Sequence, residues 1–311
     1  LCDLGKSEEA ELLYRKAIEL NPDYPEVHYN LGNLLCDLGK SEEAELLYRK
    51  AIEIKPNYPE AHSNLGNVLS DLGKLEDAEL LYRKAIELNP DLAEAHSNLG
   101  NILKDLDKLQ EALDSYLKVI DINPKLSNIY STISRFLQDS DPSKLNQSKL
   151  KDILNLLLER NDVTHTELFN AFNFVYSNEL ITNLEKLDSD FSAIELLMNN
   201  KVISNSLRKI IFRNLKLEKI LTKVRRNICH RITKNIETIN DSELQFIIAL
   251  GEQCFLNEYV YSFTEEENTS VNIIIQKCKD GEVSEIYISI LSCYFPLYKL
   301  LDQIPSLKSF N

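Results

Sequence analysis

The chain has 311 residues, of which 43% are hydrophobic and 27% charged, and this balance excludes a wholly disordered protein. The net charge of -14 lies mostly in residues 1–126, where 25 acidic side chains face 14 basic ones, so we expect no nucleic acid partner there. No apolar run is long enough to span a bilayer.

Residues 25–126 repeat a 34-residue unit three times, as 25–58, 59–92 and 93–126. A partial copy occupies residues 1–24, because the sequence Leu1–Leu20 recurs almost letter for letter at Leu35–Ile54. We therefore expect the chain to begin inside a unit and to be a fragment of a longer protein.

Each unit carries the spacing H-x2-L-G, followed by Leu, Ala, Tyr and Pro at fixed offsets. The residues are His28, Leu31, Gly32, Leu35, Ala44, Tyr48 and Pro56, then His62, Leu65, Gly66, Leu69, Ala78, Tyr82 and Pro90, then His96, Leu99, Gly100, Leu103, Ala112, Tyr116 and Pro124. This pattern resembles the tetratricopeptide repeat (TPR) signature, with His in place of its Trp, Leu in place of its first aromatic residue and Tyr in place of its Phe. The resemblance implies an all-α fold, a right-handed superhelix of helical hairpins.

The periodicity of apolar residues independently predicts two short amphipathic helices in each unit. Gly39 and Gly73 separate the first helix from the second, and Pro56, Pro90 and Pro124 end the second helix. Neither helix can bury its apolar face alone, so the units stack into an α-solenoid with a concave and a convex side.

The repeat pattern degrades beyond residue 126. The residues that stand in place of His, Leu, Gly and Leu are Tyr130, Ile133, Ser134 and Leu137. We predict a degenerate capping helix at 127–138, which closes a solenoid domain of residues 1–138. Residues 139–149 are rich in Asp, Ser, Pro and Asn and are predicted to be a linker.

Residues 150–311 are predicted to form a non-repetitive helical adaptor domain. Apolar residues three and four apart indicate helices at Leu150–Glu159, Thr166–Asn178, Asp190–Asn199, Val202–Lys234, Asp241–Asn257 and Val283–Leu301. For the β-branched run Val271–Ile275, helix is only narrowly favoured over strand.

Lys201–Lys234 carries eleven basic side chains against a single acid, Glu218. Its apolar stripe consists of Ile203, Leu207, Ile210, Leu217, Leu221, Val224 and Ile228. One interpretation is a contact with anionic lipid or nucleic acid. The favoured one is a solvated cationic face that docks on the acidic solenoid or on its own core, because a soluble helical domain needs such a stripe.

Two shorter runs carry a second resemblance. Leu217–Ile228 and Gln253–Glu267 are similar to segments that lie between TPR repeats and a catalytic domain in bacterial fusion proteins, some of them S-adenosylmethionine-dependent methyltransferases. The resemblance implies that this chain is the substrate-recruiting part of a transferase whose catalytic domain lies outside it.

Catalytic patterns are missing from the sequence itself. Beyond residue 126 the only glycines are Gly251 and Gly281, too few for the glycine-rich turn of a Rossmann-type cofactor site. The acids Glu258, Glu265, Glu266 and Glu267 are expected to be solvated rather than to act as acid and base. We predict that this chain is not an enzyme and has no catalytic residue and no cofactor.

Metal binding is not expected either. The six cysteines show no C-x-x-C pair, which favours buried free thiols in a reducing cytoplasm and hence a cytoplasmic protein. His28, His62 and His96 recur with the repeat, but they occupy the position of a core aromatic residue and are expected to pack between helices.

The strongest functional pattern is a polar stripe on each first helix, on the side opposite the core. Its members are Asn30, Asn33, Asp37, Asn64, Asn67, Asp71, Asn98, Asn101 and Asp105. First helices form the inner wall in solenoids of this class, so the stripes predict a groove. Asparagine amides both donate and accept, and a row of them can bind the backbone of an extended peptide.

This row resembles the asparagine ladder in the repeats of O-GlcNAc transferases. It departs from the carboxylate clamp of chaperone-binding TPRs, which has Lys where Asp37, Asp71 and Asp105 stand, so we expect a neutral or basic peptide. The predicted function is a protein-protein interaction scaffold, and the alternative is the recruiting part of a methyl- or glycosyltransferase. For the stripe itself, the alternative is a solvated polar face with hydrogen bonds to the neighbouring helix.

Overall fold

The computed structural model describes residues 2–185, 201–210, 215–234, 239–256, 264–296, 299–300 and 304. In this part of the chain the elements are α-helices and short 3-10 helices, with no strand. The chain divides into two compact units, Leu1–Ile133 and Ser134–Asn311. The all-α prediction is therefore confirmed.

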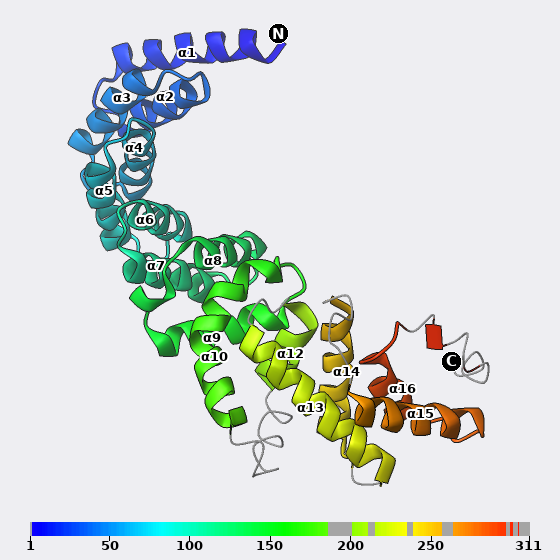
Figure 1. Ribbon diagram of the computed structural model, residues 1–311. Coiled ribbons are helices and arrows are strands. Elements are labelled where there is room, and N and C mark those ends of the chain that lie inside the picture. Colours follow the sequence, from blue (N-terminus) through cyan, green and yellow to red (C-terminus); the bar gives the residue numbers. More distant parts are fainter. Residues whose placement is uncertain are drawn as a thin grey trace. The chain divides into compact units, whose positions relative to one another are not determined.

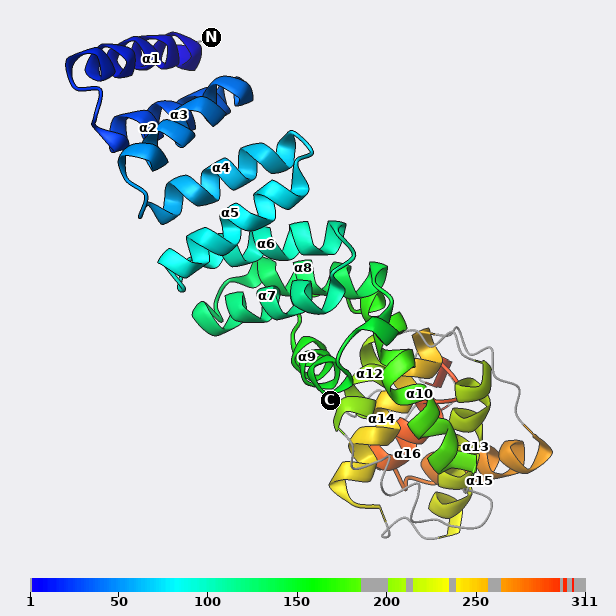
Figure 2. The ribbon, with the colours of Figure 1, turned by 90° about the vertical axis from the view of Figure 1, so that its left-hand side faces the viewer.

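Three helical hairpins correspond to the three sequence units. They are α2 (Pro25–Asp37) with α3 (Ser41–Ile54), α4 (Pro59–Asp71) with α5 (Leu75–Leu88), and α6 (Ala93–Asp105) with α7 (Leu109–Ile122), preceded by α1 (Cys2–Leu20). Figure 2 shows the hairpins stacked one after another. In the first unit, α2, α4 and α6 line the inner side of the curved stack and α3, α5 and α7 its outer side (Figure 1).

In the core of each hairpin, a tyrosine of the second helix packs against a glycine of the first helix. Tyr82 on α5 is 2% exposed, and a Cβ added at Gly66 on α4 would lie 2.9 Å from its ring. The pairs Gly32 with Tyr48 and Gly100 with Tyr116 repeat this arrangement. Glycine is required at these positions because the ring occupies the space of a side chain.

The turns between first and second helices need a left-handed backbone. Gly39 and Gly73 adopt φ values of 72° and 74°, and Asp107 takes the same conformation with φ 57° in the third hairpin. Aspartate tolerates this region better than most residues, so the glycine can be replaced there without loss of the turn.

The boundary between the units lies inside α8 (Ser127–Asp139), between Ile133 and Ser134, whereas the sequence pattern placed the end of the solenoid domain at residue 138. The expected linker, residues 139–149, belongs to the second unit. It includes the 3-10 helix η1 (Pro142–Lys144) and the buried Leu145.

The second unit is helical as predicted. Its elements are α9 (Gln147–Glu159), η2 (His165–Leu168), α10 (Phe169–Glu185), α12 (Lys201–Lys209), α13 (Leu215–Lys234), α14 (Asp241–Leu256), α15 (Glu265–Lys279) and α16 (Glu285–Ser292). The β-branched run Val271–Ile275 lies within α15 and is helical. The helix expected at Asp190–Asn199 and the acid Glu258 lie outside the described residues.

The prediction that the adjacent acids are all solvated was wrong for Glu267. Glu265 and Glu266 are exposed, but Glu267 is 1% exposed and accepts from Arg225 on α13 at 3.1 Å and from the Tyr294 hydroxyl at 3.1 Å. Glu267 also closes the capping box with Thr264 at the start of α15. These donors compensate for burial of the carboxylate.

Several cationic side chains of the basic stretch Lys201–Lys234 bind other groups of the second unit. Arg225 is 2% exposed and pairs with Glu267, and Arg231 donates to Glu243 on α14 at 2.6 Å. Lys209 donates to the carbonyl of Leu158 at the end of α9 at 2.7 Å. Several charges of this stretch therefore stabilise the second unit itself.

Candidate functional site

The nine residues of the predicted stripe belong to α2, α4 and α6, the helices on the inner side of the first unit (Figure 1). Its exposed members are Asn30, Asp37, Asp71, Asn101 and Asp105, and its half-buried members are Asn33, Asn64, Asn67 and Asn98. The stripe is thus at least partly accessible on every first helix, and on α2 and α6 one asparagine is exposed while the other is half-buried.

A hydrogen-bonded rung joins the first two hairpins. The Tyr48 hydroxyl on α3 donates to Asn33 Oδ1 on α2 at 2.7 Å, and Asn64 Nδ2 on α4 donates to the same oxygen at 2.8 Å. Two donors therefore fix the amide of Asn33. The rung therefore connects three helices: α3 and α2 of one hairpin, and α4 of the next.

The same rung recurs in the next repeat. The Tyr82 hydroxyl donates to Asn67 Oδ1 at 2.6 Å, and Asn98 Nδ2 donates to that oxygen at 2.8 Å. In the third hairpin the Tyr116 hydroxyl donates to Asn101 Oδ1 at 2.8 Å. We refer to these rungs together as the amide ladder, formed by Tyr48, Asn33 and Asn64, by Tyr82, Asn67 and Asn98, and by Tyr116 and Asn101.

Each complete rung retains unused hydrogen-bonding atoms. Within the described residues, Asn33 Nδ2 and Asn67 Nδ2 have no acceptor, and Asn64 Oδ1 and Asn98 Oδ1 have no donor. The hydrogen bonds expected for a solvated polar face are present, and every complete rung still offers one donor and one acceptor.

The ladder changes at both ends. At the first rung Asn64 Nδ2 also approaches the hydroxyl of Tyr29 at 3.2 Å, and the Tyr29 ring lies 5.0 Å from that of Tyr58. At the other end, one period after Asn98, Thr132 on α8 donates its hydroxyl to the carbonyl of Asn128 in its own helix. The ladder therefore stops where the repeat degrades.

Sequence reasoning missed the tyrosines of the ladder. Burial raises the pKa values of Tyr48, Tyr82 and Tyr116 well above the ordinary phenol value, so these hydroxyls remain protonated donors. The tyrosine in each repeat could have predicted this role. A buried tyrosine in place of the family's Phe needs a hydrogen-bond partner for its hydroxyl.

The recurring histidines are buried, and each one contacts the backbone of the preceding repeat. His28, His62 and His96 are 5%, 7% and 8% exposed. The Nε2 of His62 lies 2.9 Å from the carbonyl of Pro56, which ends the previous repeat, and the other two make the same contact. A carbonyl only accepts, so Nε2 carries the proton. Packing between helices is therefore confirmed for these residues.

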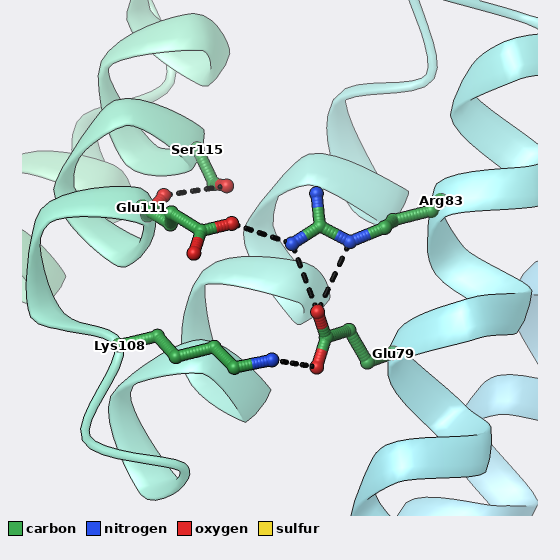
Figure 3. A network of polar contacts seen from close by, with 5 residues as sticks. All are labelled: Glu79, Arg83, Lys108, Glu111 and Ser115. Atoms are coloured by element: carbon green, nitrogen blue, oxygen red, sulfur yellow. Dashed lines mark hydrogen bonds and ion pairs between the residues drawn. The ribbon is translucent and has the colours of Figure 1, made fainter.

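The outer wall carries a second periodic network. Glu79 on α5 accepts from Arg83 at 2.8 Å and from Lys108 at 2.7 Å, and Arg83 also donates to Glu111 on α7 at 2.6 Å (Figure 3). Burial of Glu79 opposes its ionisation, but hydrogen bonds from Lys108 and Arg83 outweigh burial and lower its pKa. Glu45 with Arg49 and Lys74 repeats the arrangement one period earlier.

No group of His, Cys, Asp and Glu in the described part of the chain is arranged to hold a metal ion. Of the cysteines, Cys36, Cys229, Cys254, Cys278 and Cys293 are free thiols. Among the described helices, none combines the length and apolar character needed to cross a membrane.

Comparison with known proteins matches the repeats. Residues 1–39, 32–73 and 66–107 match a family model described as TPR repeat, and residues 93–126 match one described as tetratricopeptide repeat. No curated protein matches the chain.

Several solved structures are similar to part of the chain. YrrB, "a TPR protein with an unusual peptide-binding site", is 22% identical over 62% of this chain and 91% of its own, with a TM-score of 0.45. MamA is 24% identical over 44% of this chain and 80% of its own, with a TM-score of 0.42. The first TPR of Spaghetti (RPAP3), bound to the HSP90 peptide SRMEEVD, is 27% identical over 37% and 90%, with a TM-score of 0.36.

Proposed function

Residues 1–126 are built of tetratricopeptide repeats, and from this premise we propose that the chain is a protein-binding scaffold that holds an extended polypeptide along the inner wall of its solenoid. The protein partner contributes its backbone to the amide ladder. No chemistry on the partner is required for this role.

One observation carries the proposal: each complete rung presents a donor and an acceptor that are already oriented. The Tyr48 hydroxyl and Asn64 Nδ2 both bind Asn33 Oδ1, which leaves Asn33 Nδ2 as the donor and Asn64 Oδ1 as the acceptor. Groups that are fixed before binding lose little conformational entropy on binding. A peptide backbone offers the complementary pair, one carbonyl and one N–H.

The period of the ladder suits an extended chain. Neighbouring helices pack about 8–10 Å apart, and an extended chain in the polyproline II conformation has three residues per turn and advances about 3.1 Å per residue. Successive rungs therefore meet roughly every third residue of the bound peptide. Side chains between these positions point away from the rung and remain free to vary.

The charge of the inner wall favours a cationic partner. Asp37, Asp71 and Asp105 are exposed beside the ladder, and Asp105 has a cation, Lys104, at 3.8 Å. The negative field is thus strongest near Asp37 and Asp71. A peptide with lysine or arginine at every third position matches both the period and the charge.

The test uses a fluorescein-labelled peptide of serine and alanine with lysine at every third position, titrated with the full chain and followed by fluorescence anisotropy. We expect it to bind, and we expect the double variant Asn64→Ala and Asn98→Ala to lose this binding while keeping its helical circular dichroism. The matched control is Asn21→Ala with Asn57→Ala, two exposed asparagines off the first helices.

A second peptide with glutamate in place of lysine tests the charge and should not bind. If the double variant bound the lysine peptide as tightly as the wild type does, the amide ladder would have no part in recognition. Absence of binding to the wild-type chain would count equally against the proposal.

A further inference from the structure

The outer wall of the solenoid contains a hollow of about 600 Å³ between α5 and α7. Leu99 and Leu103 of α6 and Ile86 of α5 give it an apolar lining, and Ser115 and Lys118 of α7 line its other side. It uses none of the residues of the amide ladder.

At the hollow, the last repeat has a serine where the two earlier repeats have a leucine. Ser115 stands where the two preceding copies have Leu47 and Leu81, both half-buried. The Ser115 hydroxyl donates to the carbonyl of Glu111 in its own helix at 2.9 Å (Figure 3), so its polar group is already satisfied within α7. Replacing a leucine by a serine removes roughly the volume of an aliphatic side chain from a packed interface.

The last repeat also lacks an ion pair that a lysine makes in each of the two earlier repeats. Lys50 pairs with Glu53 at 2.9 Å, and Lys84 pairs with Glu87 at 2.9 Å. The equivalent of these lysines is Lys118, whose acid three residues on is the shorter Asp121. Lys118 is exposed and has no ion pair among the described residues.

The acidic groups around the hollow are already engaged. Glu87 pairs with Lys84, Glu111 pairs with Arg83, and Asp114 accepts from Gln110 at 2.9 Å. Lys118 therefore remains the rim charge that is open to an added carboxylate.

We propose that this hollow is a second protein-binding site, which takes a leucine-like side chain of a helical partner segment together with a carboxylate one helical turn away. The partner supplies the two groups that the earlier repeats supply to themselves: an aliphatic side chain at the position of Leu81 and an acid for the lysine. Side chains one turn apart on a helix lie about 5–6 Å from each other, and Ser115 and Lys118 are one turn apart on α7. The site is on the wall opposite the peptide groove and does not depend on the proposed function.

The test uses an alanine-based helical peptide with a single leucine and a glutamate one turn before and one turn after it, titrated with the full chain. We expect binding to the wild type, and loss of binding when the leucine of the peptide is replaced by serine. In the protein, Ser115→Leu should weaken binding by about tenfold or more, because the chain then fills its own hollow.

Folding is controlled within the same experiment. Ser115→Leu restores the residue of the preceding repeats and should leave the thermal unfolding temperature unchanged or raise it, whereas Ser115→Ala keeps the hollow open and should bind as the wild type does. Lys118→Glu should abolish binding, and a peptide with lysines in place of its glutamates should restore it.

Equal affinity of the wild type and Ser115→Leu would overturn the site, as would a wild type that does not bind the peptide. The double variant Asn64→Ala and Asn98→Ala should bind this peptide normally. Failure of the groove and failure of the hollow are therefore distinguishable.

Discussion

A buried histidine needs an acceptor for its N–H, and in each repeat that acceptor is the carbonyl of the proline that ends the preceding copy. His62 makes this bond to Pro56 at 2.9 Å. In the degenerate repeat the hydroxyl of Tyr130 makes the equivalent bond to Pro124 at 2.8 Å. Histidine and tyrosine are thus interchangeable in this role, because each places one donor at the same joint.

This equivalence predicts the outcome of two substitutions. His62→Phe leaves the Pro56 carbonyl without its donor and should lower the free energy of unfolding by about 1–3 kcal/mol. His62→Tyr keeps a donor and should cost clearly less. Urea unfolding followed by circular dichroism measures both, and equal losses would show that packing volume alone matters at this position.

Single residues also show why the site was only partly predictable from the sequence. Spacing alone placed Asn33, Asn67 and Asn101 on one side of the first helices. The hydroxyls that bind them lie fifteen residues later on another helix, and which polar groups pair there is decided by ångström-scale packing. The prediction that Glu267 is solvated failed for a similar reason, because its buried partner Arg225 is far away in the sequence.

At the scale of helices, the periodic ion pairs of the outer wall tie neighbouring second helices together. Arg83 of α5 reaches Glu111 of α7, while Lys108, the residue before α7, reaches back to Glu79 (Figure 3). Helix periodicity was sufficient to predict α2 to α7, because each has one apolar face. It also predicted a helix at 127–138, close to the observed α8, but periodicity does not indicate where one compact unit ends, and residues of α8 lie in both units.

The lowered pKa of Glu79 gives this network a pH dependence. Because its pKa in the folded chain is below the ordinary value of 4.5, its contribution to stability is complete above that value and is lost as the pH falls through the folded pKa. Glu79→Gln should therefore destabilise the chain by about 1 kcal/mol near neutral pH, and the difference from the wild type should shrink at acidic pH.

Chemical unfolding at a series of pH values measures this difference. Glu53→Gln is the control, because the Glu53 side chain is 69% exposed and its single pair with Lys50 lies within one helix. A pH-independent difference for Glu79→Gln would mean that the charge of Glu79 does not stabilise the folded chain.

At the scale of the whole chain, the repeats form contacts mainly with their immediate neighbours, as expected for a solenoid. The joint after residue 58 and the joint after residue 92 are chemically alike, since His62 and His96 bind Pro56 and Pro90 in the same way. A complete unit can therefore be removed without creating a new kind of interface.

Deletion of residues 59–92 should give a folded chain in which Asn98 donates to Asn33. The ladder loses one rung, and affinity for the lysine peptide should fall by about tenfold, since a rung contributes two hydrogen bonds of roughly 0.5–1.5 kcal/mol each. Circular dichroism and anisotropy measure the two effects. Deletion of residues 59–74, which removes α4 alone, should unfold the repeats, and a folded product would contradict the hairpin as the unit of stability.

The amide ladder also has a polarity. Asn64 donates back to Asn33 and Asn98 donates back to Asn67, so the unused N–H and the unused carbonyl follow one another in the same order at both rungs. A strand that runs in one direction presents its own amides in the matching order, and the reversed strand does not. Under the proposed function, the ladder is therefore directional: it selects one orientation of the bound peptide, and so decides which peptide terminus lies at each end of the repeats.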